Sequence, residues 1–139
     1  MSSLRRPLAA GLALLALTLG LTACLTEEEV DAACDAMSSN VYHRVKPTTG
    51  ASLFTRSLHE ATNAGINHGF TEDRGVPFTA SVGPVKGLIA IHRWYGSLNG
   101  DFLWQRVDAP APAGYVEQGA NFYAATQELR CTAPVHQFT

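Results

Sequence analysis

The sequence predicts a small, mainly β domain with one or two short helices: a compact antiparallel repeat domain of two similar strand-hairpin-strand units and a closing strand. Two observations predict this fold. Most of residues 41–78 occurs a second time, with Gly turns and aromatic segments in the same order. No segment has the long helices or the parallel βαβ spacing of a nucleotide-binding fold. An α+β fold is the alternative.

The duplication is visible in three blocks of each copy. Both copies begin with an apolar strand, continue through a Gly turn into an aromatic strand, and close with a Gly-aromatic-x-Glu block, a Gly and another aromatic strand. The blocks are 41–45, 50–54 and 69–78 in the first copy, and 90–94, 100–104 and 114–122 in the second. Residues 134–138 resemble a third opening. We therefore expect copies at about 41–83 and 88–125, a closing strand at 134–138, and a single β-rich domain over 41–139.

The N-terminus predicts export. Two arginines, Arg5 and Arg6, precede the apolar segment 8–21, which is short for a membrane-spanning helix and typical of a secretory signal. It runs into Leu-Thr-Ala-Cys at 21–24, which resembles a bacterial lipobox. We expect residues 1–23 to be a lipoprotein signal peptide and Cys24 to carry the lipid. An ordinary secreted protein with a chance cysteine near the cleavage site is the alternative.

Composition limits the partners. The chain has 10 basic and 12 acidic residues and a formal net charge of -2. Nucleic-acid binding needs clustered Lys and Arg, so we expect no nucleic-acid partner. We expect membrane contact through the lipid instead, at the cell membrane or the outer membrane. No motif indicates a cofactor.

Two further cysteines remain if Cys24 is lipidated. Cys34 and Cys131 form an even pair in an exported chain, which predicts a disulfide. A loop of that size stabilises by about 4 to 5 kcal/mol in the chain-entropy model. Two free thiols or a metal pair are the alternatives.

The lipidated N-terminus, residues 24–40, is expected to contain a short helix. Thr26 and Glu29 have the spacing of a capping box, and acidic residues fill the first turn. Apolar residues then recur with helical spacing and place Cys34 on the inner face, so we predict a helix over 27–37. A disordered tether is the alternative for this segment.

The first copy is expected to contain strands at 41–45 and 52–55 and a helix at 57–66. Ser57 is the expected N-cap of this helix and Glu60 its capping-box partner. Leu58, Ala61 and Ile66 are the expected buried residues. A further strand at 76–80 follows, and the linker between the copies spans 83–87.

The second copy is expected to contain strands at 88–95, 101–106 and 121–125. No helix is expected between the last two, because Pro110 and Pro112 exclude a regular helix from this connection.

The repeat unit resembles a family of tandem repeats of unknown function in secreted and cell-surface bacterial proteins. The family consensus reads V-Y-R-L-Y-N, then G-D-H-F-Y-T, then a short helix containing A-x-E, then G-[WY]-x-x-E-G-x-[AG]-[FW]-Y. The matching segments are 42–45 and 91–95, 50–55 and 100–104, Glu60 with Ala61, and the blocks that contain Glu72 and Glu117. The consensus His is Ser52 in one copy and Phe102 in the other, so no function that needs this His is carried over. The resemblance implies binding of envelope material.

Three groups of side chains are candidates for a site. Arg44 and Arg93 are expected to pair with Glu72 and Glu117, either as structural ion pairs or as a polar site for a sugar or a carboxylate. The aromatic residues Tyr95, Phe102 and Trp104 either fill the core or stack on sugar rings. His43, His92 and His136 hold one repeat position, and three histidines suit zinc; the alternative is that each replaces an aromatic residue on a strand. We commit to no metal and no catalytic residue.

The expected function is that of a lipid-anchored, non-enzymatic binding module at the cell envelope, for example for cell-wall or surface glycans. One alternative is a protein-binding inhibitor of an envelope-attacking enzyme, which would insert an exposed loop such as 46–50 or 96–100 into its target. A hydrolase that uses His59 or the strand histidines is the second alternative, although the chain has no recognised nucleophile or zinc-protease motif.

Overall fold

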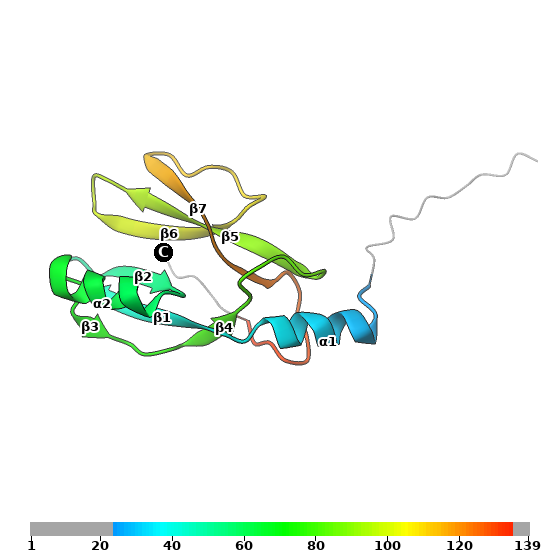
Figure 1. Cartoon of the computed structure of the whole chain (residues 1–139). Helices are drawn as coiled ribbons and strands as arrows, with labels where there is room; N and C mark the ends of the chain where they lie inside the picture. Colours follow the sequence, from blue (N-terminus) through cyan, green and yellow to red (C-terminus); the bar gives the residue numbers. More distant parts are fainter. Residues whose placement is uncertain (1–23, 135–139) are drawn as a thin grey trace, which may run out of the picture.

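The computed structural model describes residues 24–134, which form a mainly β domain with two short helices (Figure 1). Two antiparallel sheets, one of four strands and one of three, lie against each other. The prediction of a mainly β fold is confirmed. The elements are α1 (Glu27–Ala36), β1 (Ser39–Lys46), β2 (Ala51–Thr55), α2 (Leu58–Asn67), β3 (Glu72–Asp73), β4 (Phe78–Ala80), β5 (Leu88–Gly96), β6 (Asp101–Arg106) and β7 (Tyr115–Ala125).

The two copies share one topology, which confirms the duplication. In the first copy, β2 and the pair β3 and β4 flank β1; in the second, β6 and β7 flank β5. The third strand is interrupted between β3 and β4 but is continuous in β7, where the register shifts next to His92. Three pairs of glycines with positive φ occupy matching positions of the two copies: Gly50 and Gly100, Gly69 and Gly114, Gly75 and Gly119. Gly119 lies within β7, at the shift of register.

The register of the two hairpins corrects the sequence alignment by one residue. Lys46 pairs with Ala51 and Gly96 with Asp101, so the loops 47–50 and 97–100 are equally long. Counted back from these closing pairs, His43 corresponds to Arg93, not to His92. Since neighbouring strand residues face opposite sides, the prediction that His43 and His92 hold one repeat position is wrong.

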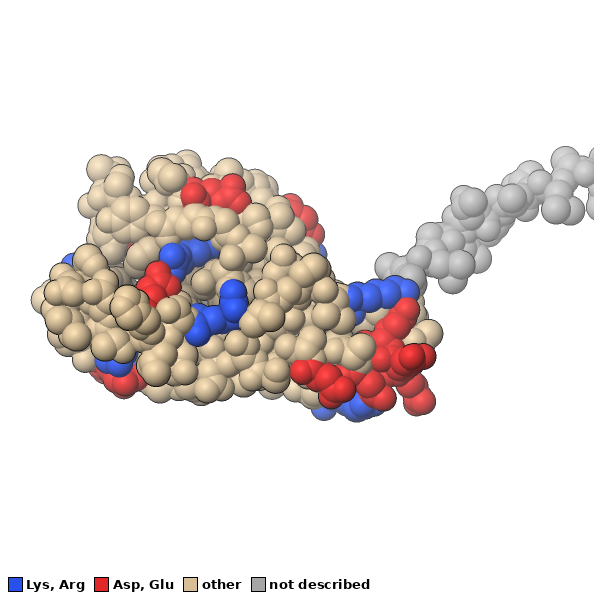
Figure 2. Space-filling model, in the orientation of Figure 1, with Lys and Arg blue, Asp and Glu red and all other residues tan. Residues whose placement is uncertain are grey.

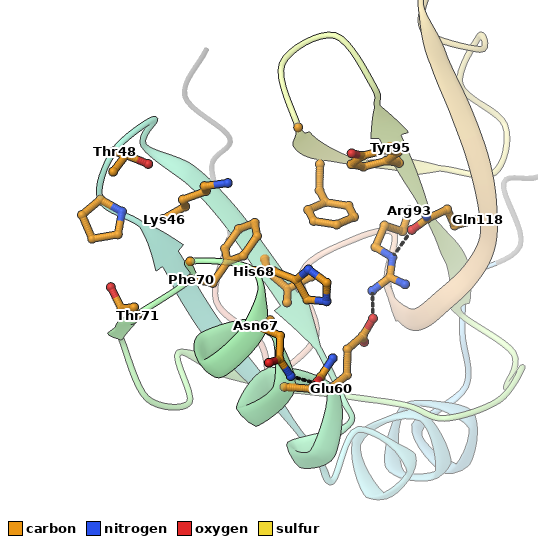
Figure 3. A pocket seen from close by; sticks show the side chains of 17 residues that line it. Lys46, Thr48, Glu60, Asn67, His68, Phe70, Thr71, Arg93, Tyr95 and Gln118 are labelled. Carbon is orange, nitrogen blue, oxygen red and sulfur yellow. Dashed lines mark hydrogen bonds and ion pairs between the residues drawn. The ribbon is translucent and has the colours of Figure 1, made fainter.

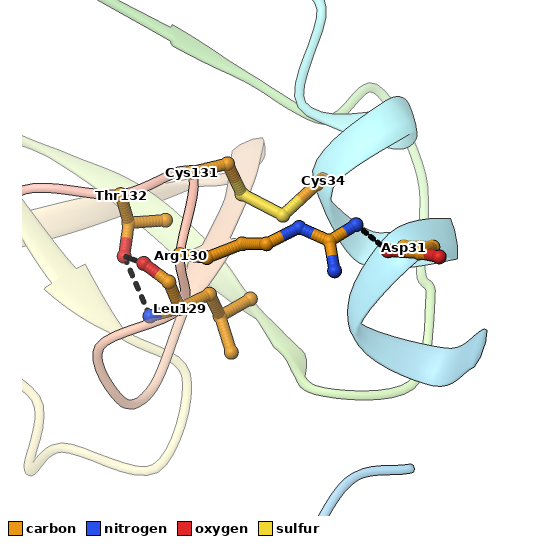
Figure 4. The surroundings of a disulfide bond; sticks show 6 residues. All are labelled: Asp31, Cys34, Leu129, Arg130, Cys131 and Thr132. Atoms are coloured by element: carbon orange, nitrogen blue, oxygen red, sulfur yellow. Dashed lines mark hydrogen bonds and ion pairs between the residues drawn. A yellow bond between two sulfur atoms is a disulfide. The ribbon is translucent and has the colours of Figure 1, made fainter. Parts of the chain in front are cut away.

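Helix α1 forms as predicted and is fastened to the end of the domain. Thr26 and Glu29 make both hydrogen bonds of the capping box. The predicted disulfide between Cys34 and Cys131 is present, with a Cα–Cα distance of 5.8 Å (Figure 4). Arg130 forms an ion pair with Asp31 beside it. The helix is therefore part of the folded domain and not a tether.

Helix α2 also forms where it was predicted, but its buried side differs. The buried residues are Ala61 and Ala64, whereas Leu58 is 56% and Ile66 75% exposed. Ile66 follows Ala61 by five positions, which turns it about 140° away at 100° per residue. Ser57 caps the helix by accepting from the Glu60 N–H at 3.1 Å. The Glu60 side chain does not return this bond, because its carboxylate faces the second copy.

Aromatic contacts between the two sheets make up much of the core. Trp104 of β6 meets Phe54 of β2 edge to face, with ring centroids 5.1 Å apart. Phe122 of β7 meets Phe78 of β4 at 5.6 Å, next to the fully buried Val41. Both contacts join one copy to the other, so neither copy buries its apolar face alone.

The described residues bear on membrane spanning but not on the two ends of the chain. Among residues 24–134, no helix is both long and apolar enough to span a membrane. The predicted signal peptide 1–23, residues 135–138 of the predicted closing strand 134–138, and His136 lie outside the described residues.

Candidate functional site

The main hollow of the domain is an open cleft of about 1000 Å³ between the two copies. Helix α2, the end of β1 and the segment around Phe70 form one wall, and β5, β6 and Gln118 of β7 form the other (Figure 3). Figure 2 shows this face hollowed between the two sheets, with basic and acidic side chains lying in the hollow. Acidic side chains also gather over α1, away from the cleft.

Three aromatic rings line the cleft. Phe102 of β6 lies between Phe70 and Tyr95, with ring centroids 6.0 Å and 5.3 Å away. Phe70 is buried against Leu53 and Ala64, while Tyr95 and Phe102 are half-buried. The cleft therefore presents an apolar aromatic surface that is supported from behind by the core.

A polar network crosses the cleft from one copy to the other. Arg93 of β5 donates to a Glu60 carboxylate oxygen at 2.8 Å and, through Nε, to the Gln118 side chain at 2.8 Å. The other Glu60 oxygen accepts a hydrogen bond from the buried Thr55 hydroxyl. The Arg93 guanidinium carbon also lies 5.4 Å from the Phe102 ring centroid, a cation–π contact. Arg93 is thus fixed by partners on three sides.

Further polar side chains line the wall that α2 contributes. The Asn67 side-chain amide donates to the side-chain oxygen Oδ1 of Asn63 at 2.6 Å, so the two amides form a pair one helical turn apart. His68 and Lys46 complete this rim. Amide, imidazole and ammonium groups can together donate to and accept from a hydroxylated ligand.

The structure brings three of the five predicted binding residues into the cleft. Arg93, Tyr95 and Phe102 line it, whereas Arg44 and Trp104 do not. Trp104 packs against both core clusters, and its indole N–H is buried without a hydrogen-bond partner among the described residues.

Arg44 has a structural partner other than the predicted Glu72. Its guanidinium pairs with Asp73 at 3.1 Å, while Glu72 pairs with Arg74 at 2.6 Å. The register explains the difference, because Arg44 lies opposite Asp73 and Glu72 lies opposite Val45. The sheet alternation therefore places Glu72 on the other face from Arg44.

The second predicted pair, Arg93 with Glu117, is also wrong. Glu117 lies opposite Trp94 in the ladder and contacts His92 Nδ1 instead. The bulge in β7 moves Gln118 next to Arg93 and leaves Glu60 of the first copy as the carboxylate partner.

The histidines lie apart from one another in the described residues. His43 Nε2 is 3.1 Å from the Ser52 hydroxyl, and its ring stacks on Phe54 at 4.2 Å. Burial lowers the pKa of His43, and the nearby Arg74 lowers it further. Residues 24–134 contain no group of three His, Cys, Asp or Glu side chains that could hold a metal ion. His59, considered for a hydrolase, is exposed on α2.

Sequence reasoning missed the residues of the cleft that come from the first copy, namely Lys46, Glu60, Asn63, Asn67, His68 and Phe70. One signal points to them. Helix α2 has no counterpart in the second copy. The polar side of α2 therefore has no second helix to pack against, and its side chains remain available to line a cleft. Which side of the helix faces the other copy follows only from the packing of the two sheets.

A smaller hollow lies between the two hairpin tips. It is lined by Thr49, Gly50 and Ala51 of the first copy and by Asn99 and Asp101 of the second. Leu98, at the tip of the second hairpin, is 91% exposed. This hollow adjoins the cleft, because Pro47, Thr48 and Gly100 of the same two loops line the cleft.

Comparison with known proteins finds a family and no individual relative. Residues 40–139 match the family model described as a domain of unknown function, DUF5648. Neither a curated protein nor a solved structure matches the chain.

Proposed function

The chain belongs to the DUF5648 family, whose function is unknown, and we propose that it is a non-enzymatic carbohydrate-binding module whose ligand occupies the cleft between the two copies. One observation supports this proposal above the others. Three aromatic rings and a set of amide side chains line the same open cleft. A sugar ring offers an apolar face that packs on aromatic rings and hydroxyl groups that hydrogen-bond to amides.

The cleft has the layout that such a ligand requires. Tyr95 and Phe102 line the aromatic wall, and Asn63 and Asn67 line the wall that α2 contributes. Figure 3 shows Asn67 on α2 and Tyr95 on the opposite wall. Binding sites for small molecules are concave and mostly apolar, with a few polar groups that fix orientation. The Glu60–Arg93 pair holds the two walls at a fixed separation, so the site is preformed.

The proposed place of action is the cell envelope. The sequence around Cys24 resembles a lipobox, and Cys24 is an exposed free cysteine at the start of the described residues. The resemblance to secreted bacterial repeats supports the same proposal. A lipid at Cys24 would leave the cleft on a domain held next to the membrane by the short connection to α1.

Calorimetric titration with a small set of soluble oligosaccharides tests the proposal. The set comprises chitotetraose, cellotetraose, tetragalacturonate and a tetrasaccharide of alternating N-acetylglucosamine and N-acetylmuramic acid. We expect at least one to bind, and Tyr95→Ala and Asn67→Ala each to weaken it severalfold. Thr62→Ala is the matched control, because Thr62 is exposed on α2 and does not line the cleft. No binding by any sugar, or equal binding by all variants, would contradict the proposal.

A protein-binding role is the second candidate, because Leu98 is 91% exposed at a hairpin tip. An exposed apolar side chain at a loop tip can insert into an apolar pocket of a partner, which removes it from water. Capture of envelope proteins on the immobilised domain would test this role. We expect a specific partner to be lost with Leu98→Ser and kept with Tyr95→Ala, the reverse of the pattern expected for a sugar.

A further inference from the structure

The basic side chains of residues 24–134 differ in whether they have an acidic partner. Most form an ion pair with a carboxylate: Arg44 with Asp73, Arg74 with Glu72, Lys86 with Glu29, Arg93 with Glu60, Arg106 with Asp108 and Arg130 with Asp31. Arg56 donates instead to the Asn121 carbonyl at 2.7 Å. Within the described part of the chain, only Lys46 has neither a carboxylate nor a hydrogen-bond partner, and it lines the cleft.

Lys46 is held in place by its surroundings. Its carbonyl closes the hairpin loop by accepting from the Gly50 N–H at 2.8 Å. Its stem passes over Gly69, where an added Cβ would lie 3.3 Å from the Lys46 Cε. Its ammonium lies 6.0 Å from the Phe70 ring centroid and points into the cleft (Figure 3). The backbone and two neighbouring residues thus direct this cation toward the site.

The charges that line the cleft do not cancel. Glu60 and Arg93 neutralise each other through their ion pair, and no other carboxylate lines the cleft in the described residues. Lys46 therefore leaves the cleft with an excess positive charge, in a chain whose formal net charge is -2. A positive site next to aromatic rings attracts anions, because the apolar walls weaken the screening by water.

We infer that the cleft selects a carbohydrate that carries a carboxylate, and that the Lys46 ammonium binds this carboxylate while Tyr95 and Phe102 pack against the sugar ring. This inference rests on the proposed function and adds the ligand class. The Lys46 ammonium supplies one positive charge with three N–H donors, which matches the single negative charge and the two acceptor oxygens of a carboxylate. Acidic sugars of polysaccharides and of cell walls have this chemistry.

Two matched pairs of ligands test the inference by calorimetric titration. The tetrasaccharide of N-acetylglucosamine and N-acetylmuramic acid differs from chitotetraose by its lactyl ether groups, which carry carboxylates. Tetragalacturonate differs from its methyl ester by its charge and by the ester methyl groups. We expect the acidic member of at least one pair to bind about fivefold or more tightly than its neutral partner, as one charge-assisted hydrogen bond allows. Raising the salt concentration should reduce this preference.

Lys46→Met is the variant that separates charge from packing, because methionine keeps an apolar stem over Gly69. We expect it to abolish the preference for the acidic ligand, so that the acidic and the neutral member of the pair bind with equal affinity. Lys86→Met is the control, since Lys86 pairs with Glu29 outside the cleft. It should change neither affinity.

The outcomes separate this inference from the proposed function. Equal binding of acidic and neutral ligands, or an acidic preference that survives in Lys46→Met, overturns the inference and leaves the carbohydrate module in place. Failure of every sugar to bind overturns both. An acetylated D-alanyl-D-alanine peptide, which has a carboxylate but no sugar ring, should bind weakly. Binding as tight as that of the acidic sugar would also overturn the inference.

Discussion

The ion pair between Glu60 and Arg93 is expected to stabilise the packing of one copy on the other. Glu60 lies on α2 of the first copy and Arg93 on β5 of the second, and the Glu60 carboxylate also accepts from the buried Thr55 hydroxyl. Removing the Glu60 charge leaves a half-buried guanidinium without its counter-ion. We therefore expect Glu60→Gln to weaken the association of the two copies and to lower the free energy of unfolding.

The magnitude depends on how far the pair is shielded from water. The side chains of Arg93 and Glu60 are 17% and 38% exposed, and the Nη1–Oε1 distance is 2.8 Å. Fully exposed pairs contribute about 0 to 1 kcal/mol, whereas a hydrogen bond to a charged group contributes about 1.5 to 3 kcal/mol. The Glu60–Arg93 pair lies between these cases, so we expect a coupling energy of about 1 to 2 kcal/mol.

A double-mutant cycle measures this coupling without the other effects of each substitution. The cycle combines Glu60→Gln with Arg93→Met, which keeps an apolar stem next to Phe102, and reads the free energy of unfolding in urea with the disulfide intact. The matched control combines Arg106→Met with Asp108→Asn. That pair has two hydrogen bonds, at 2.9 Å and 2.7 Å, but both side chains are more than half exposed.

Exposure and not the number of hydrogen bonds should decide the outcome. We expect the control cycle to give a coupling below about 0.5 kcal/mol despite its two bonds. A coupling at Glu60 and Arg93 that is no larger than the control would refute the reasoning. It would mean that the contact across the cleft is a consequence of the packing of the sheets and contributes nothing to it.

Three other predictions concern stability. Replacing Cys34 and Cys131 by alanine opens a loop with a sequence separation of 97. This should lower the free energy of unfolding, measured in urea, by about 4 to 5 kcal/mol. A loss below about 1 kcal/mol would contradict the chain-entropy account. Burial lowers the pKa of His43 below its ordinary 6.5, so the stability that neutral His43 provides is complete above pH 6.5 and is lost as the pH falls through the lowered pKa. His43→Phe, which retains a ring, should therefore show a smaller loss of stability between pH 7 and pH 4 than the parent protein, and two parallel curves would argue against this origin. Gly69 has a φ of 78°, so Gly69→Ala should cost about 1 to 2 kcal/mol in thermal unfolding, while Gly83→Ala, which meets no atom within 4 Å, should cost less.

Local chemistry was sufficient to predict the two helices and the two hairpins, but not β3 or residues 115–120 of β7. The Thr26 cap determines where α1 begins, and the Ser57 cap does the same for α2. Both caps are formed by residues adjacent to the helix in the sequence, so their spacing can be read directly. The same holds for Gly50 and Gly100, whose positive φ values close the two hairpin loops.

Strand register was the first feature that the sequence misrepresented. The His-Arg dipeptide occurs in both copies, and matching it placed His43 with His92. The strand pairing is set by the distance from the hairpin turn instead. It places His43 opposite Phe54 and His92 opposite Gln105. A slip of one residue exchanges the two faces of a strand. Glu72 lies opposite Val45 and Glu117 opposite Trp94, so each glutamate is on the other face from the arginine it was expected to pair with.

The role of Glu60 shows a second limit of sequence reasoning. Its position three residues after Ser57 indicates a capping box, and the Glu60 backbone does bond to the Ser57 hydroxyl. The Glu60 carboxylate could accept hydrogen bonds either from the nearby backbone N–H of Ser57 or from the Thr55 hydroxyl and the Arg93 guanidinium. The second choice satisfies a buried hydroxyl and a half-buried cation, and the Ser57 N–H keeps a partner because it donates to the Thr55 hydroxyl at 3.0 Å. No local pattern shows that Arg93 will be within reach.

The asymmetry between the copies explains why the domain has a cleft lined by both of them. Two identical copies would give two equivalent surfaces, each covered by its own helix. Here α2 follows the first hairpin, whereas a connection containing Pro110 and Pro112 follows the second. The polar side of α2 therefore faces β5 and β6 across the cleft instead of a second helix. The cleft is therefore lined on one side by α2 of the first copy, with its amides, and on the other by Tyr95 and Phe102 of the second copy, which has no helix at this point of the chain.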